Sequence, residues 1–404
     1  MLWRADGIPE AATGDTNGDF PLRGETILCL AAADWSGMWG RAQQFMTIFA
    51  REGNRVIYVD PPITYLSVLK NPALKRRPVG KVHSVSANIH IYHPPVFLPF
   101  GNMYRRINRV NQQRLAAGLR GVLRGLKLTP TICWTYLPNT VDLLPLLTLP
   151  SGGVVVYDCA DDHAAFPGLI DKEVVNRMEA ELFRHAHVSL ASAAELQRRK
   201  KSVAPNLLVV PNGADVSHFA RALDPDLPLP PDLAPLPRPV IGYAGAVSEW
   251  VDQELVAAAA RACSHGSVVL IGPVNTDVSY LKRLPNVHLF GWRDYRDLPA
   301  YFKGFDVALI PFKINELTRA VNPVKLYEYL AAGLPVVSAD LPEVRPFASL
   351  VKLARSPEEF GAAVRSALAS DSPGKTAARV AEAARHSWAQ RARLAAAAVA
   401  QCRK

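Results

Sequence analysis

The chain has 404 residues, of which 49% are hydrophobic and 20% charged, and its formal net charge is +10 at pH 7. This length is too great for one hydrophobic core and predicts about two domains of ordinary globular composition. No apolar run approaches the roughly 20 residues of a membrane-spanning helix, and five scattered cysteines favour buried, reduced thiols over a disulfide framework or a metal site.

The first 24 residues are polar and lack the apolar core of a signal peptide, so we expect residues 1–24 to form a disordered tail. Strand and helix patterns then alternate, which is typical of parallel sheets with crossover helices. The strand-like runs of the first half are residues 26–31, 56–59, 89–92, 131–134, 154–157, 188–190 and 207–210. We predict that residues 25–224 form one Rossmann-like domain.

Residues 225–239 carry seven prolines in fifteen positions, which predicts a semi-rigid, extended linker. The strand-like runs that follow are residues 240–243, 268–271, 287–290, 307–310, 336–338 and 351–353. They predict a second Rossmann-like domain at 240–375. The alanine-rich stretch 376–404 is helical by composition and period.

The positive charge is concentrated in one segment. Residues 61–141 contain 12 Lys or Arg and no Asp or Glu, so the remaining residues sum to about −2. A field of one sign attracts anionic partners and is not needed for folding. The segment includes an apolar, proline-punctuated loop at 91–100 and a helical run at 103–127.

In that helical run the apolar residues form one predicted stripe: Ile107, Val110, Leu115, Leu119, Val122 and Leu126. One interpretation is a sheet-covering helix with a solvated basic face. The other, which we favour, is a patch that binds anionic lipid, with Arg105, Arg106 and Arg109 on the membrane face.

The most informative motif is residues 322–339, which reads as a loop, a helix, a tight turn and a strand. Gly333 fits the left-handed position that ends a helix, and Pro335 prevents its continuation. Lys325 and Glu328 are three residues apart and share one face near the helix start, where anions are favoured. That pair suits a nucleotide diphosphate sugar, with phosphates on Lys325 and the ribose hydroxyls on Glu328.

Two further motifs follow strands. Residues 242–246 contain small residues at a strand-to-helix turn, where backbone amides can approach a pyrophosphate; a plain turn without a ligand is the alternative. Residues 157–163 place three acids at a strand end, where a carboxylate can act as a base toward an acceptor hydroxyl. Asp161 is our first candidate for that base and Asp162 the second, with His163 as a lesser alternative. The competing interpretation is that Asp161 and Asp162 cap a helix.

In their order along the chain these motifs resemble those of GT-B glycosyltransferases, in the broad group that includes glycosyltransferase family 4. Residues 33–44 resemble the glycine-containing loop after the first strand, 209–215 the entry to the interdomain linker, and 322–339 the donor-binding segment. Within that group the chain most resembles the teichuronic-acid-type enzymes that build bacterial surface polysaccharide.

The resemblance implies a GT-B fold whose two domains face a cleft, with the C-terminal helix crossing back to the first domain. It implies that Gly245, Asn322, Lys325 and Glu328 bind the donor, and that the backbone around Gly291, Trp292 and Arg293 receives the nucleotide base. It also implies that Gly37 and Arg41 belong to the cleft loop.

The chain departs from the family pattern at two places. The segment after the 242–246 turn lacks the usual basic residue, so the diphosphate depends on Lys325, backbone amides and Arg41. The position of a first family glutamate is Ala320, which leaves its sugar-side role and the stereochemical outcome unassigned.

We therefore predict a glycosyltransferase that moves a sugar from a nucleotide diphosphate sugar to a lipid-linked or polysaccharide acceptor in cell-surface polysaccharide synthesis. The alternatives are a sugar-nucleotide epimerase of the same fold and a catalytically silent, membrane-associated scaffold. We expect no metal, no cofactor and no nucleic-acid partner, and a cytoplasmic location at the inner face of the cell membrane.

Overall fold

The computed structural model describes residues 20–403, which form two compact units. Of the described residues, unit 1 comprises 20–211 and 391–403, and unit 2 comprises 212–390. Most of the predicted tail, residues 1–19, lies outside the described part. Its last residues are packed rather than disordered, because Phe20 and Leu22 are buried and the Phe20 ring lies 6.1 Å from that of Phe49.

Unit 1 is built on an eight-stranded sheet in the order β3-β4-β2-β1-β5-β6-β7-β8. All neighbouring strands are parallel except β3 and β4. The sequence patterns missed β3, because this edge strand has no buried residue and so no apolar pattern. The strands are β1 (Thr26–Leu30), β2 (Arg55–Val59), β3 (Val82–Ser86), β4 (Ile89–Tyr92), β5 (Ile132–Thr135), β6 (Val154–Cys159), β7 (Val188–Ala191) and β8 (Leu208–Val209).

The helices of unit 1 include α3, whose buried face differs from the predicted stripe. Val110 is 41% exposed, and the first buried positions of the helix are Asn108, Asn111 and Gln112. Asn111 accepts from the Leu98 amide and donates to the Leu98 carbonyl, so amide side chains replace apolar contacts there. The helices are α1 (Arg41–Arg51), α2 (Tyr65–Lys70), α3 (Arg105–Leu126), α4 (Lys172–His185) and α5 (Ala194–Lys200).

Unit 2 has a six-stranded parallel sheet in the order β11-β10-β9-β12-β13-β14. All six strands were predicted. Four of them, β9, β10, β12 and β13, are buried throughout, and runs buried on both faces are nearly continuous in apolar residues. They are β9 (Val240–Ala244), β10 (Ser267–Ile271), β11 (Val287–Gly291), β12 (Val307–Ile310), β13 (Val336–Ala339) and β14 (Val351–Ala354).

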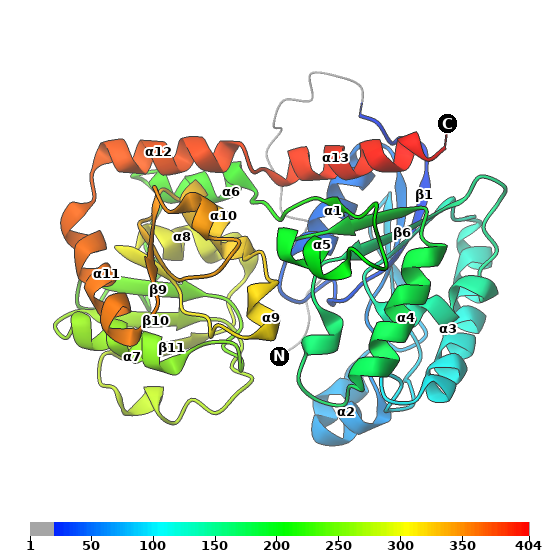
Figure 1. The fold of residues 1–404 in the computed structure, drawn as a ribbon, viewed down its shortest axis with the longest axis horizontal. Helices are drawn as coiled ribbons and strands as arrows, with labels where there is room; N and C mark the ends of the chain where they lie inside the picture. The colour runs from blue at the N-terminus through cyan, green and yellow to red at the C-terminus, as the bar shows by residue number, and fades with distance from the viewer. Residues whose placement is uncertain (1–19, 404) are drawn as a thin grey trace. The chain divides into compact units, whose positions relative to one another are not determined.

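Helices cover both faces of this sheet. In Figure 1, α7 and α11 lie on one face, and α6, α8 and α10 lie on the other. The predicted α/β fold with a Rossmann-like sheet in each half is confirmed. The helices are α6 (Val216–Ala220), α7 (Gln253–Ala262), α8 (Leu298–Lys303), α9 (Glu316–Arg319), α10 (Val324–Ala331), α11 (Pro357–Ser370) and α12 (Pro373–Ala384).

The boundary between the units differs from the predicted linker at 225–239. The division falls between Pro211 and Asn212, within the 209–215 motif, and the proline-rich segment belongs to unit 2. Leu233 of that segment is buried in the unit 2 core. Lys303 of α8 also donates hydrogen bonds to the backbone carbonyls of Asp224, Pro225 and Leu227, so specific contacts hold the prolines against unit 2.

The predicted C-terminal helix at 376–404 is two helices. After α12 the chain forms a bridge with Ala214, whose amide donates to the His386 carbonyl and whose carbonyl accepts from the Trp388 amide. This bridge interrupts the helical pattern despite its alanine-rich composition. Helix α13 (Trp388–Gln401) follows, and the chain rejoins unit 1 at Arg391.

Two expectations from composition can be compared with the structure. Within residues 20–403 no helix is both long and apolar enough to cross a membrane. All five cysteines are free thiols, and four of them are buried.

The strand orders locate where a ligand would bind in each unit. In unit 1 the chain runs outward from β1 to β2 on one side, and β5 lies on the other. In unit 2, β10 and β12 flank β9 in the same way. In open parallel sheets, ligands bind at the carboxyl ends of the strands where the order reverses. These positions are the ends of β1 and β5 and the ends of β9 and β12.

Candidate active site

Three glycines close the carboxyl ends of adjacent strands in unit 2. Gly245, Gly272 and Gly291 follow or end β9, β10 and β11, and all have positive φ, at 151°, 139° and 69°. The Gly245 amide donates to the Ile271 carbonyl at 2.8 Å, and the Gly272 amide donates to the Gly291 carbonyl at 2.7 Å. The edge is therefore a connected series of turns.

This edge has no space for side chains at two of its positions. A Cβ on Gly245 would lie 3.0 Å from Lys325 Cε, and a Cβ on Gly272 would overlap the Gly245 carbonyl. Gly245 and Gly291 were predicted as site residues, whereas Gly272 was missed. Its position directly after the apolar run 268–271 was the signal that could have found it.

Lys325 lies in the first turn of α10, the helix that follows β12 and the α9 loop. Its Nζ is 4.7 Å from the centroid of the Phe312 ring and 5.4 Å from that of Tyr243. Burial lowers the pKa of Lys325 to about 8, although the nearby Glu328 opposes that shift. Aromatic faces stabilise an ammonium less than a carboxylate would, so this cation remains available to an anionic ligand.

Glu328 lies one turn deeper in α10 and is only 8% exposed. None of residues 20–403 donates a hydrogen bond to its carboxylate. Burial raises the pKa of Glu328 to about 7, and the positive charge of Lys325 opposes the rise. Buried polar groups are nearly always hydrogen-bonded in folded proteins. The Glu328 carboxylate therefore has the properties of a group whose donors come from a ligand.

Asn322, predicted to bind the donor, makes structural contacts within unit 2. Its Oδ1 accepts from the Asn212 amide at 3.0 Å, and its carbonyl accepts from Asn212 Nδ2 at 2.7 Å. Its Nδ2 donates to Tyr327 Oη and to Glu343 Oε2. These bonds use both hydrogens of Nδ2 and one lone pair of Oδ1, and they hold the loop before α10.

The Arg293 side chain is also engaged within unit 2. Its guanidinium donates to Asp232, to Tyr301 Oη and to the Phe290 and Trp292 carbonyls. Only its backbone, as the resemblance implied, can meet a nucleotide base. Trp292 beside it is 52% exposed.

In unit 1 a cavity of about 240 Å³ opens at the carboxyl ends of β1, β5 and β6. Its lining includes Ala32 after β1, Leu137 and Asn139 after β5, and Asp161 and His163 after β6. This is the place that the strand order indicates. The cavity contains the first-choice base together with the histidine alternative.

Asp161 is the acid of this cluster that faces the cavity. None of residues 20–403 donates a hydrogen bond to its carboxylate. Burial raises the pKa of Asp161 to about 7; Arg41 opposes the rise, and Asp162 and Asp158 add to it. His163 Nε2 lies 2.8 Å from the Tyr136 carbonyl, and burial lowers the pKa of His163, which favours the neutral ring.

Asp162, the second candidate base, is neutralised within unit 1. Its carboxylate accepts from Arg199 Nη1 at 2.9 Å and from Lys200 Nζ at 3.3 Å, and it is almost fully buried. Both acceptor contacts are with cationic side chains of α5. The structure therefore assigns Asp162 to an ion cluster rather than to catalysis.

Arg41 and Gly37 belong to the loop and helix that follow β1. Arg41 Nε lies 2.9 Å from Asp158 Oδ2, and Arg41 Nη1 donates to the Val210 carbonyl at 2.8 Å. These contacts hold the buried guanidinium within unit 1, in contrast to the predicted role on a diphosphate. The Gly37 amide donates to the Asp34 carbonyl in a tight turn of the same loop.

The three predicted membrane-facing arginines are not equivalent. Arg105 is paired with Asp142 at 3.0 Å and with Glu181 of α4, which joins the two helices on one side of unit 1 (Figure 1). Arg106 is exposed, and the Arg109 side chain is 61% exposed with Asp142 at 3.7 Å. Arg105 is therefore structural, and Arg106 and Arg109 remain candidates.

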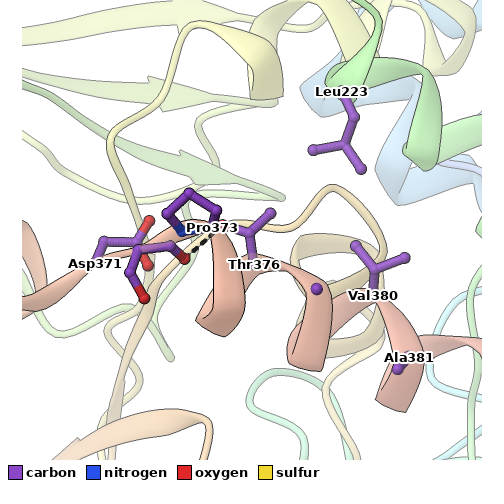
Figure 2. Close-up of a pocket in the computed structure, with 8 residues that line it drawn as sticks. Leu223, Asp371, Pro373, Thr376, Val380 and Ala381 are labelled. Atoms are coloured by element: carbon purple, nitrogen blue, oxygen red, sulfur yellow. Dashed lines mark hydrogen bonds between the residues drawn. The ribbon is translucent and has the colours of Figure 1, made fainter.

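A separate hollow of about 800 Å³ lies in unit 2 beside α12. Figure 2 shows Leu223 across from Thr376 and Val380 in this pocket. Asp371 at its edge is paired with Arg379. Its mainly apolar lining offers nothing for a diphosphate, so it is no part of the candidate site. No group of three or more His, Cys, Asp or Glu in the described part of the chain is arranged to hold a metal ion.

Comparison with known proteins shows what the chain is similar to. Residues 238–370 match the family of glycosyl transferases group 1. Sucrose-phosphate synthase of Thermosynechococcus elongatus aligns with a TM-score of 0.67 at 15% identity, covering 91% of this chain and 96% of that chain. HepE of Anabaena, solved with UDP and glucose, aligns with a TM-score of 0.59 at 15% identity, covering 92% and 97%. The chain thus has the GT-B fold; at these identities the solved structures show the fold alone.

A protein of Bacillus subtilis (strain 168) that carries the name teichuronic acid biosynthesis glycosyltransferase TuaH is 32% identical over 215 residues. The aligned part is 49% of this chain and 53% of that protein, so the chain spans about half the length of the curated relative it matches. The predicted resemblance to GT-B glycosyltransferases of the teichuronic-acid type is confirmed.

Proposed function

We propose that the protein is a glycosyltransferase that takes a sugar from a nucleotide diphosphate sugar for cell-surface polysaccharide synthesis. The observation that carries this proposal is Glu328, a buried carboxylate to which none of residues 20–403 donates a hydrogen bond, one turn from a desolvated Lys325. Vicinal ribose hydroxyls supply the missing donors to Glu328. The diphosphate meets Lys325 beside the Gly245 turn, whose own amide is engaged with the Ile271 carbonyl, and the proposal needs no metal cofactor.

For the acceptor we propose the 240 Å³ cavity of unit 1. Asp161 accepts the proton of the acceptor hydroxyl there, because a carboxylate with a pKa of about 7 is a stronger base than an ordinary one. A sugar hydroxyl of a lipid-linked or polysaccharide acceptor suits such a small polar cavity. The Bacillus relative, by its name, belongs to surface polysaccharide synthesis, which supports this class of acceptor.

Calorimetric titration with UDP tests the donor site. Lys325→Ala and Glu328→Gln should each weaken binding by roughly 10- to 150-fold, since each removes a charge-assisted hydrogen bond worth about 1.5–3 kcal/mol. Lys352→Ala, which alters an exposed lysine on β14, is the matched control and should bind UDP as the wild type does. Unchanged affinity in both site variants, with folding verified by circular dichroism, would refute the donor assignment.

We also propose that the basic segment 61–141 holds the protein on an anionic membrane surface, where a lipid-linked acceptor would be found. Arg106, Arg114, Arg120 and Arg124 of α3 are exposed, and none of them has an acid within salt-bridge distance in the described part of the chain. Each cation near such a surface contributes about 1 kcal/mol.

Co-sedimentation with liposomes tests this second proposal. Arg106→Glu combined with Arg120→Glu should release the protein from vesicles containing anionic lipid, whereas Lys352→Glu should not. High salt should also release the wild type, because surface charges are screened over about 10 Å at 0.1 M. Equal sedimentation with neutral and anionic vesicles would contradict the proposal.

A further inference from the structure

Unit 1 contains a groove that the proposed donor and acceptor sites do not use. It has a volume of about 1010 Å³ and runs beside α3, bordered by α2 and by the β3 and β4 strands. We call it the α3 groove. Its apolar lining includes Val79, Val82, Pro95, Val96, Val122 and Leu126. The volume is at the upper end of the roughly 300–1,000 Å³ typical of ligand pockets.

Three glycines of α3 line the helix side of the α3 groove. Gly118, Gly121 and Gly125 are spaced three and four residues apart, so they lie along one face of α3. A Cβ on Gly121 or Gly125 would meet no atom within 4 Å, so the space in front of both is open. Glycine is the poorest helix former after proline. Local helix stability therefore does not explain these three glycines: Gly118 makes room for Tyr92, and Gly121 and Gly125 leave space open to a ligand.

Tyr92 of β4 supplies a polar group at the floor of the groove. The residue is only 1% exposed, and its hydroxyl lies where a Cβ on Gly118 would be. No residue in the described part of the chain forms a hydrogen bond with this hydroxyl. Burial raises the pKa of Tyr92, so the group stays a donor. This hydroxyl lines the groove and is available to donate to a ligand oxygen there.

The rim of the groove is apolar and basic. Tyr65 lines it and is 51% exposed, and Leu69, one turn further along α2, is 75% exposed. Helix α2 buries none of its residues. Arg114 also lines the groove, and Lys81 lies in the sequence between Gly80 and Val82, which both line it. Since residues 61–141 contain no acid, the whole surround has one sign of charge.

We propose that the α3 groove binds a hydrocarbon chain of an anionic lipid. The hydrocarbon chain lies along Gly121 and Gly125. The lipid phosphate pairs with Arg114, and the Tyr92 hydroxyl donates a hydrogen bond to an oxygen of the same lipid. Charge favours this occupant over a second copy of the protein, which would place two segments of 12 cations against each other. The inference rests on the proposed membrane association and adds a specific lipid site to it.

Dihexanoyl phosphatidylglycerol below its critical micelle concentration is the probe, titrated calorimetrically into the full chain. Gly121→Leu combined with Gly125→Leu fills the groove and should weaken binding at least tenfold. Gly121→Ala combined with Gly125→Ala raises helix propensity in the same way with little filling, and should stay within about threefold of wild type. Tyr92→Phe should weaken binding a few-fold while leaving the apolar lining intact.

Three results would overturn the proposal. The first is that the wild type shows no saturable binding of the lipid. The second is that the folded variant Gly121→Leu with Gly125→Leu binds it with unchanged affinity, and the third is that dihexanoyl phosphatidylcholine binds equally well. Full displacement of the lipid by glycerol phosphate would also overturn it, because the site would then recognise phosphate alone. UDP binding is measured on the same samples. If the wild type does not bind UDP, the glycosyltransferase proposal is contradicted, and the lipid result can still be interpreted. If Gly121→Leu combined with Gly125→Leu abolishes lipid binding but not UDP binding, the lipid site in the α3 groove is supported independently of the donor site.

Discussion

A buried lysine in unit 1 and a partly buried lysine in unit 2 have opposite surroundings. Lys200 in unit 1 lies 2.7 Å from Glu179 and 3.3 Å from Asp162. Burial alone would lower the pKa of Lys200, but the two carboxylates raise it above its ordinary value. Lys325 in unit 2 has aromatic faces instead of carboxylate contacts, and burial lowers its pKa to about 8.

The acids follow the same division. Glu179 and Asp162 accept hydrogen bonds from several partners, whereas Asp161 and Glu328 accept none from residues 20–403 and have pKa values raised to about 7 by burial. A buried charge with partners stabilises a fold only if its cost is balanced locally. When a buried charge has no partner in the protein, a bound ligand can offset part of the free-energy cost of burying it. The contrast separates the structural ion cluster from the candidate site residues.

The largest expected effect comes from breaking the partnered cluster. Lys200→Met should destabilise unit 1 by about 3–5 kcal/mol, because it leaves two carboxylates buried without their shared cation. Lys325→Met should not lower stability, since none of residues 20–403 forms a salt bridge with Lys325 and its lowered pKa means that burial already costs the charged form free energy. Thermal denaturation of both variants at pH 7 measures the difference. Equal losses of stability would break the comparison between the two lysines.

The next effect separates the two neighbouring aspartates. Asp161→Asn should reduce turnover by about 10² or more while leaving UDP affinity nearly intact, because a base acts on the acceptor side. Asp162→Asn should instead lower the melting temperature. The wild-type rate should rise with pH through about 7 as Asp161 loses its proton. If Asp161→Asn keeps full turnover and Asp162→Asn loses it, the base has been assigned to the wrong residue.

A third effect is a gain in stability when the unpartnered acid is removed. The pKa of Glu328 is about 7 in the folded protein against an ordinary 4.5, so unfolding releases a proton between these pH values. The free energy of unfolding therefore falls as pH rises from 4.5 to 7. Glu328→Gln avoids that loss and should be more stable than the wild type by about 1–3 kcal/mol above pH 7.

The gain should vanish below pH 4.5, where the glutamate is protonated in both states. Thermal denaturation from pH 4 to 8 without nucleotide measures it. A Glu328→Gln variant that is less stable than the wild type at pH 8 would show that the carboxylate has partners in the folded protein.

Much of the fold could be predicted because its signals are local. Strands buried on both faces give continuous apolar runs, and Gly333 and Pro335 mark the end of α10 in the sequence. The edge strand β3 and the polar buried face of α3 could not be predicted in this way. Their form depends on partners distant in sequence, such as the Leu98 backbone bound by Asn111.

The candidate site residues could likewise be predicted only where the signal is local in the sequence. Motif spacing brought Lys325 and Glu328 together, because three residues on a helix fix a shared face. Asp161 and Asp162 are adjacent in the sequence, and nothing local distinguishes them. Arg199 and Lys200 neutralise only Asp162, and that information lies in the packing of α5 against the end of β6.

The smallest expected effect is a change of donor affinity with pH. With a pKa of about 8, Lys325 loses its proton above that pH in the free protein, whereas a bound diphosphate keeps it protonated. UDP affinity should therefore fall about fivefold between pH 8 and pH 9. Lys325→Arg keeps its charge throughout and serves as the control, because it shares any titration of the nucleotide itself. Calorimetry at the two pH values gives the loss of UDP affinity for the wild type and for Lys325→Arg. If wild type and Lys325→Arg lose affinity equally, Lys325 carries a full charge in the free protein, and burial does not lower its pKa.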